Sequence, residues 1–176
     1  MKTYIKKIST PALFLLSFIL AFSCSDSIND NERNKLPDNE YKVTITQGVW
    51  GNVWLWEGDF MPYTDNSSGG KITAIQREIY VYEATNDSLL ESSTNPMYFG
   101  GTFFTKINSE LIATIQSDKD GFFQITLNPG KYSFFVKIDT FFYSHGWDSE
   151  GDIMPATVTI NNVIKRQIDL TYNATY

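Results

Sequence analysis

Histidine and cysteine are almost absent from this chain of 176 residues, which contains one of each, His145 and Cys24. A single cysteine excludes a disulfide within the chain. A single histidine excludes the common catalytic zinc sites, which use about three protein ligands and usually two or more histidines. The sequence also lacks an HExxH motif, a GxSxG nucleophile turn and a glycine-rich phosphate loop. It therefore gives no support for an enzyme and predicts no cofactor and no metal site.

Positive charge is also scarce, because 14 lysine and arginine residues stand against 20 acidic residues and give a net charge of −6. The first 23 residues contain three of the lysines and no acidic residue, so a chain shortened by them carries −9. A domain this acidic does not attract nucleic acid or anionic lipid through its charge. We therefore expect no nucleic-acid partner.

Residues 1–23 have the layout of a secretory signal peptide. Lys2, Lys6 and Lys7 precede an apolar run, Ala12–Phe22. This run is shorter than the about 20 apolar residues that a membrane-spanning helix needs, so a retained transmembrane helix is the weaker interpretation. The run ends in LAFSC, which resembles the lipobox at which lipoproteins are cleaved and acylated. We expect acylation of Cys24 to anchor the protein in a membrane, since two or more acyl chains hold a protein stably. The alternative is an ordinary cleavage site beside a free thiol.

Residues 24–40 are predicted to be the acylated cysteine followed by a flexible tether. This segment is polar and contains only two aliphatic residues, too few to offset the entropy lost on ordering. Its acidic start resembles the export signals of surface lipoproteins in some Gram-negative bacteria. We therefore expect a folded domain over residues 41–176, held at the outer membrane or cell surface of a Gram-negative bacterium. The sequence does not indicate which leaflet holds the anchor.

From Tyr41 onward, apolar and polar residues alternate with the two-residue period of β-strands, and turn residues interrupt the alternation. No stretch has the period of a long amphipathic helix. Seven short strands in about 130 residues predict an all-β sandwich or barrel. The predicted strands are Gly48–Trp56, Gln76–Glu83, Leu111–Ser117, Phe122–Leu127, Lys131–Lys137, Ala156–Ile160 and Ile164–Tyr172.

The alternation also predicts the core and two turns. Asp120-Gly121 is predicted as a tight hairpin in which the glycine adopts positive φ. Asn128-Pro129-Gly130 is predicted as a type II turn with Gly130 at its positive-φ position. A register shift of one residue would expose each predicted core set. These sets are Ile79 and Val81; Phe123, Ile125 and Leu127; Tyr132, Phe134 and Val136; and Ile164, Ile168 and Leu170.

One stretch, Ala113–Lys137, reads ATIQSDKDGFFQITLNPGKYSFFVK and resembles the central motif of carboxypeptidase regulatory-like, or prealbumin-like, domains. Those domains have an Asp-x-x-Gly turn, an alternating strand, a Pro-Gly turn and a tyrosine-containing strand. The matching residues are Asp118, Gly121, Phe123, Pro129, Gly130, Tyr132 and Val136. The resemblance extends over about Gly48 to Leu170 and implies a seven-stranded Greek-key β-sandwich with long loops. It implies little about activity, because one fold hosts many functions. The chain is also similar to stand-alone lipoproteins with segments like Gly58–Pro62 and Arg77–Tyr82.

Three predicted loops, Gly58–Lys71, Ala84–Thr102 and Asp139–Met154, are long for a small sandwich, and such loops often carry function. The third loop contains the histidine and three alternating acidic residues, His145, Asp148, Glu150 and Asp152. Alternating carboxylates resemble part of a calcium loop, but the glycine and distal glutamate of the full pattern are missing. We interpret the acidic residues as a solvated loop, with calcium binding as the alternative. We expect the histidine to pack against Trp147 or Tyr143.

Aromatic residues alternate with aliphatic residues on two predicted strands. Trp50, Trp54 and Trp56 lie on the face opposite Val49, Val53 and Leu55, and Tyr80 and Tyr82 lie opposite Ile79 and Val81. If the aliphatic faces form the core, the rings lie on the outside, where an apolar patch of several hundred Å² normally marks an interaction site. We therefore predict four ligand-binding residues, Trp54, Trp56, Tyr80 and Tyr82. In the alternative, the long loops cover these rings and form a second small core.

Together these features predict a non-enzymatic surface lipoprotein that acts as a binding or interaction module at the cell envelope. Its partners would be the membrane, through the lipid on Cys24, and a polysaccharide or an envelope protein. The alternative is a purely structural envelope lipoprotein without a soluble ligand. An enzyme, the third interpretation, would need a cleft that gathers His145 with carboxylates.

Overall fold

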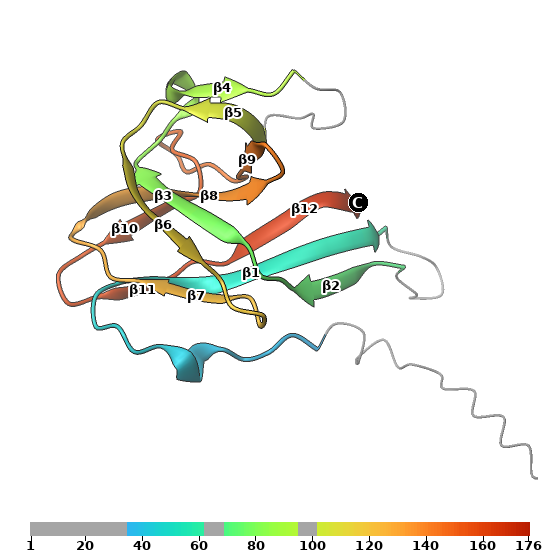
Figure 1. Cartoon of the computed structure of the whole chain (residues 1–176), viewed down its shortest axis with the longest axis horizontal. Coiled ribbons are helices and arrows are strands. Elements are labelled where there is room, and N and C mark those ends of the chain that lie inside the picture. Colours follow the sequence, from blue (N-terminus) through green and yellow to red (C-terminus); the bar gives the residue numbers. More distant parts are fainter. Residues whose placement is uncertain (1–34, 62–68, 95–101) are drawn as a thin grey trace, which may run out of the picture.

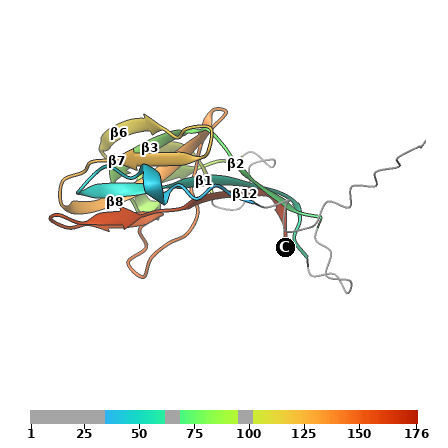
Figure 2. The same cartoon turned by 90° about the horizontal axis from the view of Figure 1, so that it is seen from below.

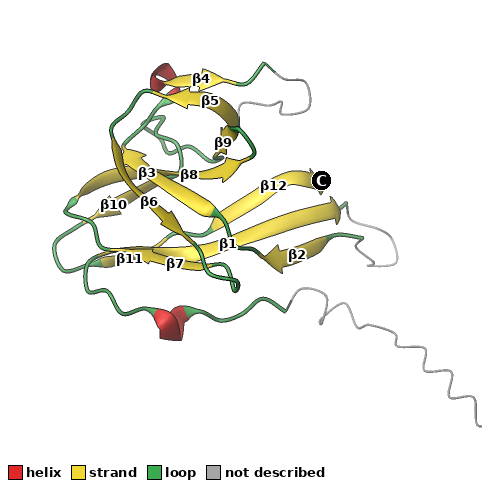
Figure 3. Ribbon diagram, viewed as in Figure 1, coloured by secondary structure: helices red, strands yellow, loops and turns green. Residues whose placement is uncertain are grey.

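The computed structural model describes residues 35–61, 69–94 and 102–176, so the predicted signal peptide, Cys24 and most of the predicted tether lie outside the described residues. The described chain is all-β, as predicted, and its helices are two short 3-10 turns, η1 (Glu40–Lys42) and η2 (Asp87–Leu89) (Figure 3). None of the described helices has the length and apolar character needed to span a bilayer. The strands are β1 (Gly48–Asp59), β2 (Lys71–Ala74), β3 (Glu78–Glu83), β4 (Leu90–Ser92), β5 (Phe103–Ile107), β6 (Leu111–Gln116), β7 (Phe122–Ile125), β8 (Gly130–Ile138), β9 (Phe141–Tyr143), β10 (Pro155–Val158), β11 (Val163–Lys165) and β12 (Ile168–Thr175).

Two sheets form a sandwich (Figures 1 and 2). The first sheet is built on β1, which pairs in parallel with β11 and β12 on one side and antiparallel with β7 and β2 on the other. The second sheet has the order β4-β5-β9-β8-β3-β6, with β10 paired to β8. In both views, β1, β12 and β2 extend beyond the rest of the sandwich. This extension carries three aromatic residues that contact one another, Trp56, Phe60 and Tyr176.

The predicted number of seven strands is wrong, because twelve strands are present among the described residues. β4 and β9 lie inside predicted loops, and each has only three residues, too few to show an alternating pattern. The predicted strand Ile164–Tyr172 divides into β11 and β12 at Arg166. A side chain at Gly51 would lie only 1.7 Å from the carbonyl oxygen of Arg166, so the division depends on a close backbone approach that glycine permits.

The core between the two sheets confirms most of the predicted core residues. Six of the predicted core residues have an exposed fraction of 1% or less: Ile79, Val81, Phe134, Val136, Ile168 and Leu170. Ile125 and Ile164 are only partly buried, although they pack against this core. β8 is buried on both faces, because Phe135 and Ser133 are as inaccessible as Phe134. Strict alternation therefore misses the second face of β8.

The two predicted turns differ in outcome. Gly121 has φ of +76° and closes a tight turn with Asp118, which confirms the predicted turn and its positive φ. The turn is not a β-hairpin, because β6 before it and β7 after it belong to different sheets, so it connects the two sheets. The type II turn at Gly130 is wrong, since Gly130 is not among the glycines with positive φ. Gly130 is instead the first residue of β8 and pairs with Val158 of β10, so it takes extended geometry.

The packed domain begins before the predicted boundary at Tyr41. Asn39, which we assigned to the tether, is only 2% exposed. Its amide nitrogen donates to Asn52 Oδ1 at 2.7 Å and to the Asp120 carbonyl oxygen at 2.8 Å. The residues before β1 therefore run across the first sheet instead of leaving it as a free tether (Figure 1).

Candidate functional site

The four predicted ligand-binding aromatic residues lie in different environments. Trp54 is 4% exposed and Tyr82 is 7% exposed, so the prediction that they form an exposed aromatic face is wrong. Trp56 and Tyr80 are half-buried. The four residues also belong to two different sheets, since the tryptophans lie on β1 and the tyrosines on β3. They do not make one site.

Trp54 is buried because the turn that connects β6 to β7 lies on its ring. A side-chain carbon built on Gly121 would lie 3.0 Å from Trp54 Cζ3, so the backbone of this turn contacts the indole directly. Trp50, four residues before Trp54 on β1, is covered by the Phe122 ring at 6.2 Å and by the Lys165 ammonium at 4.8 Å from its ring centre. These covering groups are distant in sequence, which is why the pattern along β1 did not reveal them.

Tyr82 packs against aromatic rings on the face of β3 opposite Ile79 and Val81, in a part of the core that β5 and β9 cover. Its ring meets Phe135 at 5.7 Å and Phe142 at 6.2 Å, both edge to face. Phe104 of β5 closes this cluster with an edge contact to Phe135 at 6.0 Å. The alternative that these rings are covered is thus confirmed for Tyr82, although strands β5 and β9 supply the cover and the covered rings belong to the main core cluster.

Tyr80 lies at the margin of this aromatic group and is only partly buried. Its ring meets Phe142 edge to face at 5.1 Å, and its hydroxyl donates to a carboxylate oxygen of Glu78 at 2.8 Å. The hydrogen bond to Glu78, together with burial, raises the pKa of Tyr80. Tyr80 therefore presents only part of its ring to solvent, with its polar end already bound.

Of the four predicted ligand-binding residues, Trp56 is the one that belongs to an accessible aromatic group. It packs against Phe60 at 5.0 Å and Tyr176 at 6.4 Å, and the rings of Phe60 and Tyr176 stack at 5.8 Å. We call these three residues the distal aromatic cluster. They lie at the end of the extension made by β1 and β12, where Figure 1 marks the C-terminus. Tyr176 is 64% exposed, so the cluster offers ring surface to solvent.

Polar groups border the distal aromatic cluster. Trp56 Nε1 donates to Asp169 Oδ1 at 3.0 Å, which fixes the orientation of the indole. Gln167 Nε2 donates to both carboxylate oxygens of Asp169, at 2.8 and 2.9 Å. Burial raises the pKa of Tyr176, and the negative charge of Asp169 adds to this. The arrangement thus combines flat rings with a carboxylate and an amide, which can stack on a ligand and hydrogen-bond its hydroxyls.

Sequence reasoning missed Phe60 and Tyr176. Phe60 falls in the predicted loop Gly58–Lys71, whereas β1 continues to Asp59, and Tyr176 follows the last predicted strand. The two rings meet because β1 and β12 are parallel and in register, with Asp59 opposite Thr175. No local signal in the sequence specifies that register.

The three acidic residues of the third predicted loop converge on a lysine. Lys131 Nζ lies 2.6 Å from Asp148 Oδ2, 2.6 Å from Glu150 Oε2 and 2.5 Å from Asp152 Oδ2. The carboxylates lie within 4.8 Å of one another, close enough to share a cation, and the ammonium of Lys131 meets all three. Hydrogen bonds from Lys131 lower the pKa of Asp148 and raise that of Lys131. The loop is therefore less solvated than expected.

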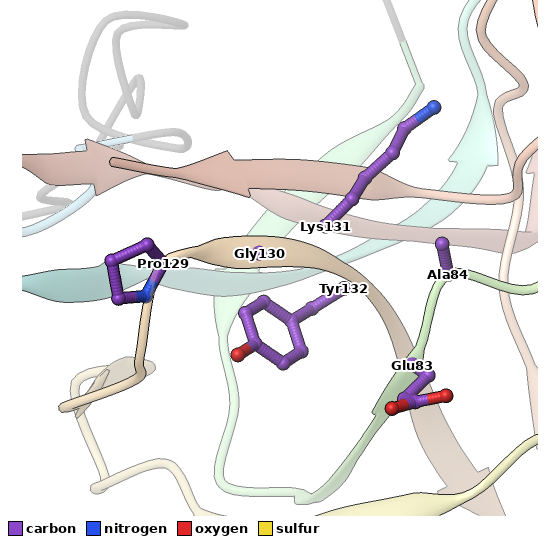
Figure 4. A pocket seen from close by; sticks show the side chains of 6 residues that line it. All are labelled: Glu83, Ala84, Pro129, Gly130, Lys131 and Tyr132. Carbon is purple, nitrogen blue, oxygen red and sulfur yellow. The ribbon is translucent and has the colours of Figure 1, made fainter. Parts of the chain in front are cut away.

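A hollow of about 310 Å³ lies beside this charged group, and Figure 4 shows the residues that line it. The side chains of Lys131 and Tyr132 leave β8 in opposite directions in this view. Tyr132 donates its hydroxyl hydrogen to the Asn128 carbonyl oxygen at 3.0 Å, so its polar end is already bound. Glu83 supplies the one acidic side chain of the lining, which also includes Ala84, Pro129 and Gly130.

His145 is half-buried and lies 6.4 Å from the Tyr143 ring, edge to face, as one of the two predicted contacts. Trp147, the other predicted contact, is 45% exposed and donates its indole hydrogen to Asp87 Oδ1 at 3.1 Å. Within the described ranges, His145 forms no ion pair with a carboxylate.

No family model, curated protein or solved structure matches this chain. The resemblance to carboxypeptidase regulatory-like domains therefore stays a prediction, while the all-β sandwich stands on the structure itself.

Proposed function

We propose that this chain is a non-enzymatic, lipid-anchored module of the cell envelope that binds polysaccharide through the distal aromatic cluster. In this proposal Cys24 carries the lipid and attaches the domain at the outer membrane or cell surface. The observation that supports ligand binding is the accessible stack of Trp56, Phe60 and Tyr176 beside Asp169.

The chemistry of this cluster suits sugars. The CH faces of a sugar ring pack on flat aromatic rings, and its hydroxyls need donors and acceptors at the rim of the contact. Asp169 accepts and Gln167 donates next to the indole of Trp56. Because the indole is already fixed by Asp169, little side-chain freedom is lost when a ligand binds.

A structural envelope lipoprotein without a soluble ligand is the second candidate. The burial of Trp54 and Tyr82 favours it, because these rings stabilise the sandwich and offer no surface to a ligand. The first candidate assigns ligand binding to the distal aromatic cluster, whereas the second assigns it no ligand.

Titration of the purified full chain with a panel of oligosaccharides distinguishes the two candidates. We expect quenching of tryptophan fluorescence with affinity in the millimolar to micromolar range, about −4 to −8 kcal/mol, because stacking contacts are individually weak. Tyr176→Ala and Trp56→Ala should abolish the quenching. Trp147→Ala is the matched control, since Trp147 is an exposed indole that also donates to a carboxylate, at a different place on the domain.

Loss of quenching in Trp147→Ala, or no quenching with any oligosaccharide, would refute the binding proposal and leave the structural candidate. Tyr176→Ala is the cleaner variant, because Tyr176 is mostly exposed and its removal should leave the stability unchanged.

A further inference from the structure

The strand β6 (Leu111–Gln116) forms an edge of the second sheet, because among the described strands it pairs with β3 only. Ser117 N donates to the Arg77 carbonyl oxygen, so residue 117 points its backbone groups toward β3. In an antiparallel ladder these directions alternate, which turns the backbone N–H and C=O of Thr114 and Gln116 away from β3. Within the described part of the chain, β6 therefore presents backbone groups along its outer side that no other strand pairs.

Edge strands usually carry charges or proline, which prevent pairing with another chain. β6 has neither, since its sequence is LIATIQ, and its one irregularity is a register shift next to Leu111. The edge strand β10, by contrast, begins with Pro155. The protection expected of an exposed edge is thus weak at β6.

The two ends of β6 differ in shape. Leu111 and Ile112, at its start, are 47% and 39% exposed. At its other end, Thr114, Ile115 and Gln116 line a hollow of about 460 Å³ together with Glu78 of β3. Leu111 lies on the same face of the sheet as Thr114, because both are paired with residues of one face of β3, Tyr82 and Tyr80. One end of the strand is an apolar projection, and the other end is a recess.

We propose that two copies of this chain associate through antiparallel pairing of their β6 strands around a two-fold axis. Antiparallel pairing sets the start of each strand against the end of the other, so Leu111 and Ile112 of each copy lie beside the hollow of the other copy. The contact occurs twice by symmetry, which is what makes a surface self-complementary. The outward backbone groups of Thr114 and Gln116 gain partners in the same step.

Charge also favours this strand as the contact. The chain has a net charge of −6, so most faces of two copies repel each other at close approach. Like charges placed directly opposite one another destabilise a strand pair. The uncharged segment Leu111–Gln116 lets two identical backbones pair without such an opposition.

Cysteine cross-linking of the full chain in its own membranes tests the proposal. Thr114→Cys places a thiol in the middle of β6, where the two-fold axis brings both copies together, and Cys24 is the one native cysteine. We expect a short bismaleimide to convert most of this variant into a covalent dimer that contains two differently tagged copies. Thr157→Cys, on the exposed side of the edge strand β10, is the matched control and should stay monomeric, as should the wild type.

A second change separates pairing from misfolding. Leu111→Lys, added to Thr114→Cys, replaces an exposed apolar side chain with a charge and should remove the dimer, while tryptophan fluorescence keeps its wild-type maximum. Three results would overturn the proposal: a folded Thr114→Cys variant that stays monomeric, equal cross-linking at Thr157→Cys, or a product that joins the chain to a different protein.

Discussion

The ammonium of Lys42 lies 2.8 Å from a carboxylate oxygen of Asp118, although the two residues are 76 positions apart in the sequence. The same ammonium lies 2.8 Å from Asp120. This contact joins the segment before β1 to the turn between β6 and β7. Because the same turn also covers Trp54, the contact with Lys42 stabilises the turn in the position that buries this tryptophan.

The turn that Lys42 contacts resembles a second turn, in the third predicted loop. Asp118 Oδ1 accepts from the backbone N–H groups of Asp120 and Phe122, each at 2.9 Å. Asp148 Oδ1 accepts in the same way from Glu150 and Asp152, each at 3.0 Å. Both turns have the spacing Asp-x-x-Gly, and both glycines have positive φ. Each turn also binds one lysine, Lys42 or Lys131, so the acidic residues serve turn geometry and ion pairing.

Lys42→Met should loosen the segment before β1. The half-exposed ion pairs of Lys42 are worth about 0.5–1 kcal/mol, and their loss also frees the chain around Asn39. We expect a lower urea midpoint and faster proteolysis within residues 35–47. Lys106→Met is the control, because Lys106 pairs with Glu91 at the open surface and its loss should change the free energy of unfolding by less than about 0.5 kcal/mol. Equal effects of the two variants would show that Lys42 does not hold the segment.

The Asp118 contact also predicts a pH dependence of stability. Burial of Asp118 opposes its charged form, but the hydrogen bonds from Lys42 and from the backbone outweigh burial, so the pKa of Asp118 lies below its ordinary value. A carboxyl whose pKa is lowered by folding contributes stability at pH above its unfolded pKa, about 3.9, and this stability is lost as the pH falls further.

We therefore expect the wild type to lose stability between about pH 5 and pH 2, and Asp118→Asn to lose less over this range. Urea midpoints measured across the range give the comparison. Identical slopes for the two proteins would contradict the assigned role of Asp118.

Gly121→Ala should destabilise the domain by about 1–3 kcal/mol, because alanine resists positive φ and its side chain would meet the Val53 carbonyl oxygen at 2.6 Å. Gly130→Ala should cost less than about 1 kcal/mol, since Gly130 is extended and the nearest atom is the movable end of Tyr132, at 3.1 Å. Denaturant midpoints of the two variants, compared at equal slope, measure the difference in stability. A Gly130→Ala variant as unstable as Gly121→Ala would conflict with the extended geometry of Gly130.

The sequence predicts a structural feature when residues close together in the chain determine it, and misses a feature that distant segments determine. Alternation located β1, β3 and β8, and the positive φ of Gly121 was predicted correctly because a tight turn requires it. The exposure of each aromatic residue was not predictable, because Trp54 is covered by a turn 67 residues further along the chain. The distal aromatic cluster likewise depends on the parallel pairing of β1 with β12, which brings Phe60 next to Tyr176. Such long-range pairings leave no periodic trace in either strand.

Trp54 and Trp56, the second of which we propose to bind ligand, should differ in how much each contributes to stability. Trp54→Ala should cost about 3–5 kcal/mol, as truncation of a fully buried aromatic side chain does. Trp56→Ala should cost clearly less, because Trp56 is half-buried and Phe60 and Tyr176 can close over the vacated space. Urea melts of the purified full chain, followed by circular dichroism so that neither variant loses its signal, measure both values. If Trp56→Ala were as destabilising as Trp54→Ala, the distal aromatic cluster would be part of the core of the domain, and its accessible rings would no longer support a role in binding.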